Sequence, residues 1–347
     1  MKNFTFDLSL ISKYRSALMG IATIGILMCH ANAYGVSLPF HLDSVFGLGQ
    51  GGVMIFFFVS GVGLYFSSRK LEYSVSGILS WYKKRFIRLF VPYLIIYGSA
   101  LFLELSENSV FPTGEYFFRL STLSYWTDQT GAWFVAVLVP LYLLTPLWNK
   151  LQDNNIISTV LTVLAFAAMS FIPSPFKSAF SQAAFFFVGF WMGRYIMEGI
   201  ELSFKTLAYC TAFFAILLCG YYIFDIGSLL MIIVIPFVFI FCWMLDMIRL
   251  RWLNKLLEFF GSISLESYLL NVTLIIWIDH FNLLPGVLYS YRYMFIVVTG
   301  ILLATIINRI TKPLISLVCS QTLDLQRSFL HQGLYDKSIK FMPIMKV

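Results

Sequence analysis

Apolar stretches of membrane-crossing length recur along almost the whole chain. Ten of them approach the ~20 residues that an α-helix needs to cross the hydrocarbon core of a bilayer. Only 12% of the residues are charged and 59% are hydrophobic, whereas a soluble domain carries about 25% charged residues. We therefore predict an all-α polytopic membrane protein. The expected spans are 14–34, 52–68, 86–105, 132–149, 156–172, 179–197, 205–224, 227–247, 261–280 and 293–318.

The positions of the cations indicate how these spans are oriented. When the N-terminus is placed in the cytoplasm and the spans alternate, 21 of the 24 Lys and Arg residues fall inside, and only Arg119, Lys177 and Arg292 fall outside. Such asymmetry is the positive-inside pattern, so we expect an even number of spans and both termini in the cytoplasm. The prediction is a multi-pass protein of the plasma (inner) membrane. Its transmembrane domain covers 1–319, a short cytoplasmic tail covers 320–347, and the first span is retained.

A histidine within the first expected span is the main candidate for chemistry. His30 follows Arg15 by 15 residues, which places it about 22 Å farther along a helix. An imidazole can take a proton from a hydroxyl and return it near neutral pH. Asp43 and Asp128, in expected outer loops, are candidates to orient it. The equally weighted alternative is a neutral histidine that caps its helix or bonds to a neighbouring helix.

A basic cluster at the inner start of the third span is the second candidate. Within Trp81–Tyr93, Lys84 and Arg88 are four residues apart and Arg85 and Arg88 are three apart, so they share a helix face. Paired guanidinium groups suit phosphate oxygens. The alternative is an ordinary positive-inside anchor, which the residues alone favour.

Four further polar or aromatic residues are candidate substrate contacts, each beside a structural interpretation. Ser60 lies in a glycine-rich span, and helix packing explains it better than a functional role. Trp133 is placed at the outer interface, where aromatic residues are common. Glu266 is a carboxylate well inside a span, and pairing with an inner arginine would explain it structurally. Asn271 lies five residues beyond Glu266 on the same expected helix.

Several common chemistries and partners have no sequence pattern here. We find no GxSxG, Walker A or HExxH motif, and the five cysteines are scattered without metal-ligand spacing, so no metal site is expected. A net charge of +7 suggests nucleic acid in a soluble protein. In this chain the cations follow the membrane topology, so we expect no nucleic-acid partner.

Five segments, taken in order, resemble the acyltransferase-3 family of integral-membrane acyltransferases. Each is weakly specific alone, but together with ten spans and two inner termini they make a fairly specific match over most of the chain. They are GIATIGILMCH (20–30), GGVMIFFFVSG (51–61), KRFIRLFVPY (84–93), WFVAVLVPLYLLTPL (133–147) and GSISLESYLLN (261–271).

This resemblance implies transfer of an acyl group, usually acetyl, from cytoplasmic acyl-CoA as co-substrate. The acceptor it implies is a hydroxyl of a surface polysaccharide or a lipid-linked sugar. His30 aligns with the proposed catalytic histidine of the family, and Arg85 and Arg88 with its arginine pair. The family often has a basic residue where this chain has Met19; Arg15, one turn earlier on nearly the same face, is our candidate substitute.

Other mechanisms and functions remain open from the residues. A covalent acyl-enzyme through Cys29 or Ser60 is the alternative chemistry. A secondary transporter or exporter of a small polar solute would also use polar residues near the membrane midplane. A third alternative is a regulatory or assembly protein without activity.

Overall fold

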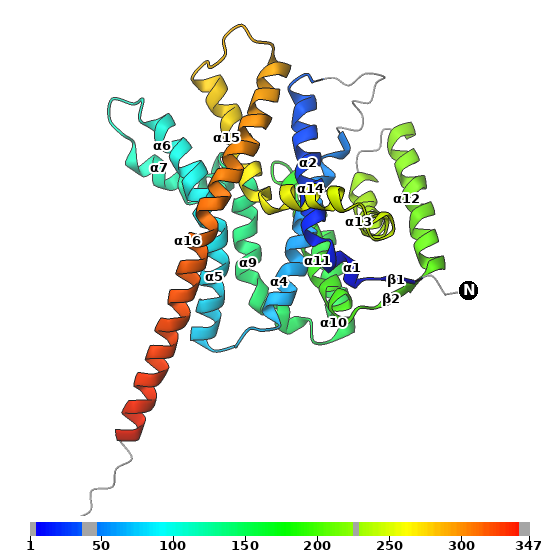
Figure 1. Ribbon diagram of the computed structural model, residues 1–347, viewed down its shortest axis with the longest axis vertical. Coiled ribbons are helices and arrows are strands. Elements are labelled where there is room, and N and C mark those ends of the chain that lie inside the picture. The colour runs from blue at the N-terminus through cyan, green and yellow to red at the C-terminus, as the bar shows by residue number, and fades with distance from the viewer. Residues whose placement is uncertain (1–4, 37–46, 225–228, 340–347) are drawn as a thin grey trace, which may run out of the picture.

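The computed structural model describes residues 5–36, 47–224 and 229–339, which fold almost entirely into helices around one core (Figure 1). A small antiparallel sheet joins the start of the chain to its middle, with Thr5 opposite Ser203. The elements are β1 (Thr5–Asp7), α1 (Ser9–Lys13), α2 (Arg15–Ala33), α4 (Gly51–Ser68), α5 (Val75–Tyr93), η2 (Leu94–Gly98), α6 (Ser99–Leu105), α7 (Thr113–Leu120), α8 (Leu123–Thr127), α9 (Trp133–Leu151), α10 (Asn155–Ser170), α11 (Lys177–Glu198), β2 (Glu201–Ser203), α12 (Phe204–Phe224), α13 (Leu229–Ile248), α14 (Arg251–Ser262), α15 (Ser264–His280) and α16 (Tyr289–Ile339).

Local sequence signals explain several helix boundaries. The side chain of Ser74 accepts a hydrogen bond from the backbone N–H of Gly77, and Asn154 caps α10 in the same way. Gly199 ends α11 in the left-handed conformation at φ 63°, which glycine adopts without strain. Pro92 lacks an N–H, and the π-helical turn η2 follows it within one continuous helix from Val75 to Leu105.

Glycines allow α2 to approach its neighbours at backbone distance. A Cβ atom on Gly20 would lie 1.9 Å from the carbonyl oxygen of Leu257 in α14, and one on Gly261 would lie 1.9 Å from that of Ser16. On another face of α2, a Cβ on Gly52 of α4 would lie 2.5 Å from the carbonyl oxygen of Ala22. Helices can cross this closely only where small residues meet, so these glycines set the position of α2.

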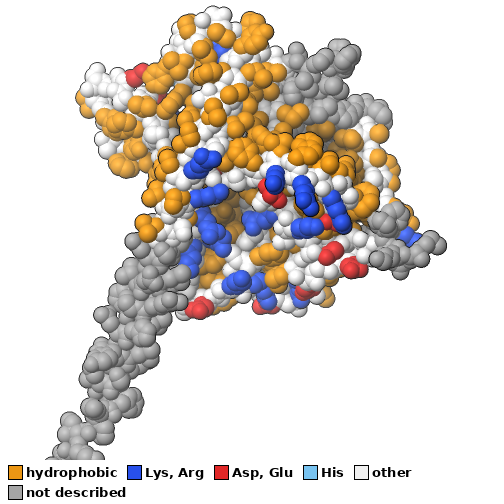
Figure 2. Space-filling model, in the orientation of Figure 1, with side chains coloured by type: hydrophobic (Ala, Val, Ile, Leu, Met, Phe, Trp, Pro, Cys, Tyr) orange, Lys and Arg blue, Asp and Glu red, His pale blue; other side chains and the backbone are white. Residues whose placement is uncertain are grey.

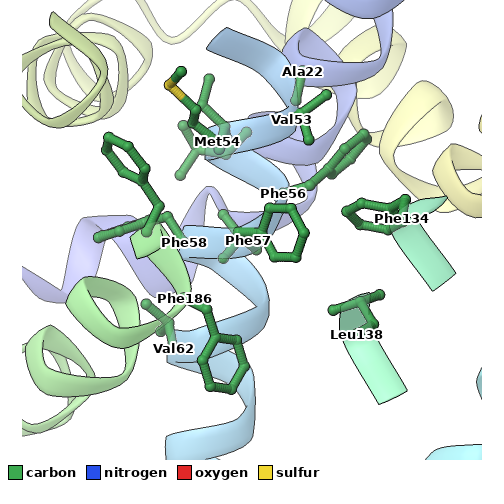
Figure 3. Close-up of a cluster of buried hydrophobic side chains, with 14 of the residues drawn as sticks. Ala22, Val53, Met54, Phe56, Phe57, Phe58, Val62, Phe134, Leu138 and Phe186 are labelled. Atoms are coloured by element: carbon green, nitrogen blue, oxygen red, sulfur yellow. The ribbon is translucent and has the colours of Figure 1, made fainter. Parts of the chain in front are cut away.

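The core beside α2 is rich in phenylalanine. Phe56 and Phe57 of α4 lie against Phe134 of α9, with ring centroids 6.1 Å and 5.0 Å from it (Figure 3). Phe57 also lies 6.4 Å from the ring of Trp133. We call Phe56, Phe57, Trp133 and Phe134 the aromatic layer. It joins α4 to α9 between the two ends of the helix bundle.

The apolar segments expected to span the membrane all fall on helices. Within the described residues, four helices are long and apolar enough to cross a membrane: Gly51–Ser68, Val75–Leu105, Trp133–Leu151 and Tyr289–Leu317. Helices α14 and α15 add a fifth candidate as one broken span bent by 61°, and three shorter apolar helices lie in α10, α12 and α13. These helices confirm an all-α chain with membrane-spanning character. Ten spans and the orientation of the termini stay predictions.

The surface charge is unevenly distributed. Figure 2 shows Lys and Arg side chains gathered over the lower half of one face, while the upper half is mostly hydrophobic. The α4–α5 connection lies at the lower end in Figure 1, and the α15–α16 connection lies at the upper end, where α2 also ends. The Lys and Arg side chains of this face therefore lie toward the end that carries the α4–α5 connection.

Candidate functional site

A basic cavity of about 530 Å³ lies where α2, α4 and α5 meet. It contains four cations, which face a single carboxylate, that of Glu72, among the lining residues. Such a surplus of positive charge suits a polyanion. The lining residues are Arg15, Gly63, Phe66, Ser67, Lys70, Leu71, Glu72, Gly77, Ser80, Trp81, Lys84 and Arg85.

Two of the cations pack against other residues that line the cavity. The guanidinium of Arg15 packs on Gly63, where a Cβ atom would lie 2.4 Å from one of its nitrogens. The guanidinium carbon of Arg85 lies 5.7 Å from the centre of the Trp81 ring, and the Trp81 indole N–H donates to Ser67 at 3.3 Å. Arg15 therefore reaches the same cavity as the basic cluster of α5, although it is on a different helix.

Arg88 is placed differently from Arg85. It is exposed and lies outside the lining of the basic cavity. Its charge still acts on Tyr142 of α9, together with the charges of Arg15 and Arg85. Tyr142 thus belongs to the surroundings of this cavity, and nothing in its sequence context distinguishes it from the other tyrosines.

His30 lines a second cavity, of about 420 Å³, which we call the His30 cavity. Several of its side chains are polar and none of the lining residues is charged at neutral pH when His30 is neutral. Trp133 and Cys29 are among them. The lining residues are Ile26, Cys29, His30, Gly49, Gln50, Val53, Tyr125, Gln129, Gly131, Trp133, Pro175, Ser178, Ala179 and Gln182.

A chain of hydrogen bonds connects His30 to the backbone of its own helix. The Nδ1 atom of His30 lies 2.5 Å from Oδ1 of Asn271 in α15. The side-chain amide of Asn271 donates to the hydroxyl of Tyr293 in α16 at 3.3 Å. That hydroxyl donates to the carbonyl oxygen of Leu27 at 2.6 Å. Asn271 and Tyr293 are both almost fully buried, so this chain is shielded from water.

The direction of the chain determines which ring nitrogen of His30 carries the proton. A backbone carbonyl can only accept, so Tyr293 donates its proton to Leu27 and accepts from Asn271. The amide oxygen of Asn271 then accepts from Nδ1–H of His30. In neutral His30, Nε2 is consequently the nitrogen with the free lone pair, as a general base requires.

The aromatic layer lies between the two cavities along α4. Val53 lines the His30 cavity and Gly63 lines the basic cavity, ten residues and about 15 Å apart on the helix. Phe56 and Phe57 occupy the turn after Val53, and Phe57 is completely buried. A ligand extending from one cavity to the other would have to pass this layer.

The remaining candidates are distributed as follows. Trp133 lines the His30 cavity, whereas Ser60 and Glu266 line neither cavity. Glu266 accepts a hydrogen bond from Asn308 of α16 at 2.8 Å, so its recorded partner is an amide and not the inner arginine considered above. Asn271 contacts His30 itself. Asp128 makes no recorded contact with His30, and Asp43 lies outside the described residues.

The sequence patterns identified His30 and Asn271 as candidates but not Tyr293 or Leu27, which complete the hydrogen-bond chain. The partners His30 and Asn271 are separated by 241 positions, and Tyr293 and Leu27 by 266. Polar residues at expected helix positions are the only available signal, and they do not indicate which helices pack together. Within the residues that the structure describes, no group of three or more His, Cys, Asp or Glu side chains is arranged to hold a metal ion.

Comparison with known proteins shows the family. The model of the acyltransferase-3 family, described as an acyltransferase domain, matches residues 17–309. This match covers most of the chain and every lining residue of the two cavities except Arg15. Neither the curated proteins nor the solved structures contain a match to the chain. The chain belongs to the acyltransferase-3 family and is a membrane acyltransferase.

Proposed function

We propose that this protein transfers an acetyl group from acyl-CoA to a hydroxyl of a surface polysaccharide or lipid-linked sugar. The main support for this proposal is the arrangement of α2. Its first residue, Arg15, lines a basic cavity, and His30 lines an uncharged polar cavity. A donor with a phosphorylated end and an acceptor with hydroxyl groups match these two environments. The proposed location is the plasma (inner) membrane, with the basic cavity facing the cytoplasm.

The donor is assigned to the basic cavity by its charge. Arg15, Lys84 and Arg85 line it and would bind the CoA phosphates, with Lys70 adding a fourth positive charge. Arg88 contributes to the potential from outside the lining. Because Arg15 and His30 are about 22 Å apart on one helix, the long pantetheine arm has to carry the acetyl group past the aromatic layer.

The acceptor hydroxyl is assigned to the His30 cavity, where His30 acts as general base. Nε2 removes the hydroxyl proton while the oxygen attacks the thioester carbonyl carbon. The tetrahedral intermediate then expels the CoA sulfur, breaking the carbon–sulfur bond, and the imidazolium returns the proton to that thiolate. The hydrogen bond to Asn271 keeps the proton on Nδ1 and fixes the ring throughout.

Replacement of His30 tests the proposal directly. Purified His30→Ala protein in lipid vesicles, supplied with labelled acetyl-CoA and host glycans, is expected to lose acetyl transfer by ~10²-fold or more. His280→Ala is the matched control, because His280 also ends a helix but bonds to Glu107 and lines neither cavity. Undiminished acetylation by folded His30→Ala protein would contradict the mechanism. Absence of acetyl transfer by the unaltered protein would contradict the proposed function.

A further inference from the structure

One buried amide in the His30 cavity has an unused hydrogen-bonding atom. Gln182 lies on α11, and only 7% of its surface is exposed to solvent. Its side-chain nitrogen donates to the hydroxyl of Ser178, one turn earlier, at 3.2 Å. Its side-chain oxygen is buried and has no hydrogen-bond partner. Burying an acceptor without a partner costs free energy, so an unpartnered amide oxygen on a residue that lines a cavity calls for an explanation.

The residues around Gln182 restrict which chemical groups could be its hydrogen-bond partner. Gln182 and His30 line the same cavity, together with Gln50, Gln129 and Ser178, and the lining contains no Asp, Glu, Lys or Arg. An amide oxygen accepts a hydrogen bond from a hydroxyl or an N–H group. A carboxylate or phosphate on the acceptor would be desolvated here without a counter-ion, which is strongly unfavourable.

We propose that Gln182 is a specificity-determining residue that binds a hydroxyl or amide N–H of a neutral sugar unit while a second hydroxyl of that unit faces His30. This inference rests on the proposed function and adds the class of acceptor. The ring of Trp133, in the same lining, supplies an apolar surface for the sugar face. Gln182 thereby sets which hydroxyl reaches Nε2.

The test separates acceptor recognition from acyl transfer by using water as a competing acceptor. Purified protein in vesicles receives labelled acetyl-CoA with an alkyl β-glucoside, an alkyl β-N-acetylglucosaminide or an alkyl β-glucuronide. Transfer to the glycoside and hydrolysis of acetyl-CoA are measured together, since both use His30. We expect at least one of the neutral glycosides to be acetylated and the glucuronide to be disfavoured by ~10²-fold or more, because its carboxylate would be buried unpaired.

Two variants with the same substitution distinguish recognition from packing. Gln182→Met keeps the side-chain volume and removes the acceptor atom, so the ratio of transfer to hydrolysis is expected to fall about tenfold or more. Gln152→Met is the control, because Gln152 is also buried with an unpartnered amide atom but lies outside the His30 cavity. Its ratio is expected to stay within about twofold of the unaltered protein.

Several outcomes would overturn the assignment. An unchanged ratio in Gln182→Met, an equal fall in Gln152→Met, or efficient acetylation of the glucuronide would each show that Gln182 does not select a neutral sugar. Hydrolysis without transfer to either neutral glycoside would do the same while leaving acyl transfer chemistry intact. A protein that neither hydrolyses acetyl-CoA nor transfers its acetyl group would instead overturn the proposed function, and this inference with it.

Discussion

At the scale of single residues, the carbonyl oxygen of Leu27 helps to determine the tautomer of His30, three residues later. Because it can only accept, it orders the protons of Tyr293, Asn271 and His30 in turn. This series of hydrogen bonds begins and ends on α2. It therefore connects the imidazole of His30 to the backbone of its own helix through side chains of α15 and α16. This arrangement makes the tautomer of His30 depend on Asn271 and Tyr293, which line neither cavity.

Tyr293→Phe is the first prediction at this scale. Loss of the hydroxyl leaves the amide of Asn271 without its acceptor, so the amide can turn and no longer favours Nδ1–H. The turnover rate is expected to fall about tenfold with little change in the KM for acetyl-CoA, and Asn271→Ala is expected to cost ~10²-fold. Tyr291→Phe is the control, because Tyr291 is exposed on the same helix. Steady-state kinetics in which Tyr293→Phe changes only KM would contradict this role.

Arg85→Ala is the second prediction at this scale. Arg85 lines the basic cavity, so its removal is expected to raise the KM for acetyl-CoA about tenfold while the turnover rate changes less. Lys83→Ala removes an exposed cation from the same helix that does not line the cavity, and should leave KM within about twofold. Equal effects of the two substitutions on KM would show that the basic face acts only through its overall charge.

At the scale of elements, α2 is positioned by backbone contacts more than by side chains. It crosses α14 where Gly20 and Gly261 meet backbone carbonyls, and it crosses α4 at Gly52. A methyl group at such a crossing cannot be accommodated by a side-chain rotation, so the helices have to separate. Both cavities contain residues of α2 and would be distorted together.

Gly20→Ala is accordingly expected to destabilise the fold. The added Cβ would lie 1.9 Å from the carbonyl oxygen of Leu257, and overpacking of this kind costs about 1–3 kcal/mol or more. We expect the Tm of the detergent-solubilised protein to fall by about 5 °C or more. Gly114→Ala is the control, since a Cβ there meets no atom within 4 Å. A Tm for Gly20→Ala equal to that of Gly114→Ala would refute the close crossing.

The elements also show what a sequence can and cannot predict here. Hydropathy predicts where the helices lie, because each long apolar segment has to bury its backbone polar groups in helical hydrogen bonds. Hydropathy did not identify α14 as a separate helix. This helix has both charged and apolar residues, and a sharp bend at Ile263 follows it. The sequence identified His30, Lys84 and Arg85 as candidate site residues. It did not predict the hydrogen bond between Glu266 and Asn308, because that pairing depends on packing between helices that are far apart in the sequence.

At the scale of the whole molecule, the two cavities make the two ends of the helix bundle chemically different. One end has a surplus of cations around a cavity, and the other has an uncharged polar cavity around His30. In the proposed arrangement the cations would serve two functions, since they would orient the helices in the membrane and attract the phosphates of the donor. If the basic cavity binds acyl-CoA as proposed, reversing the protein would place that cavity on the side without acyl-CoA, so the proposed topology and the proposed chemistry are linked.

Cysteine accessibility tests this arrangement in intact cells. In a background with the five native cysteines replaced by alanine, single cysteines are introduced at four exposed positions: Ser76, Ser109, Glu201 and Leu288. Ten spans with cytoplasmic termini predict that a membrane-impermeant maleimide labels only positions 109 and 288, because three expected spans separate each of these from 201. Labelling at 76 and 201 after the cells are opened is the control for reactivity. Labelling of position 201 in intact cells, or loss of labelling at 288, would show that at least one of the expected spans does not cross, and the basic cavity could then no longer be assigned to the cytoplasm by counting spans.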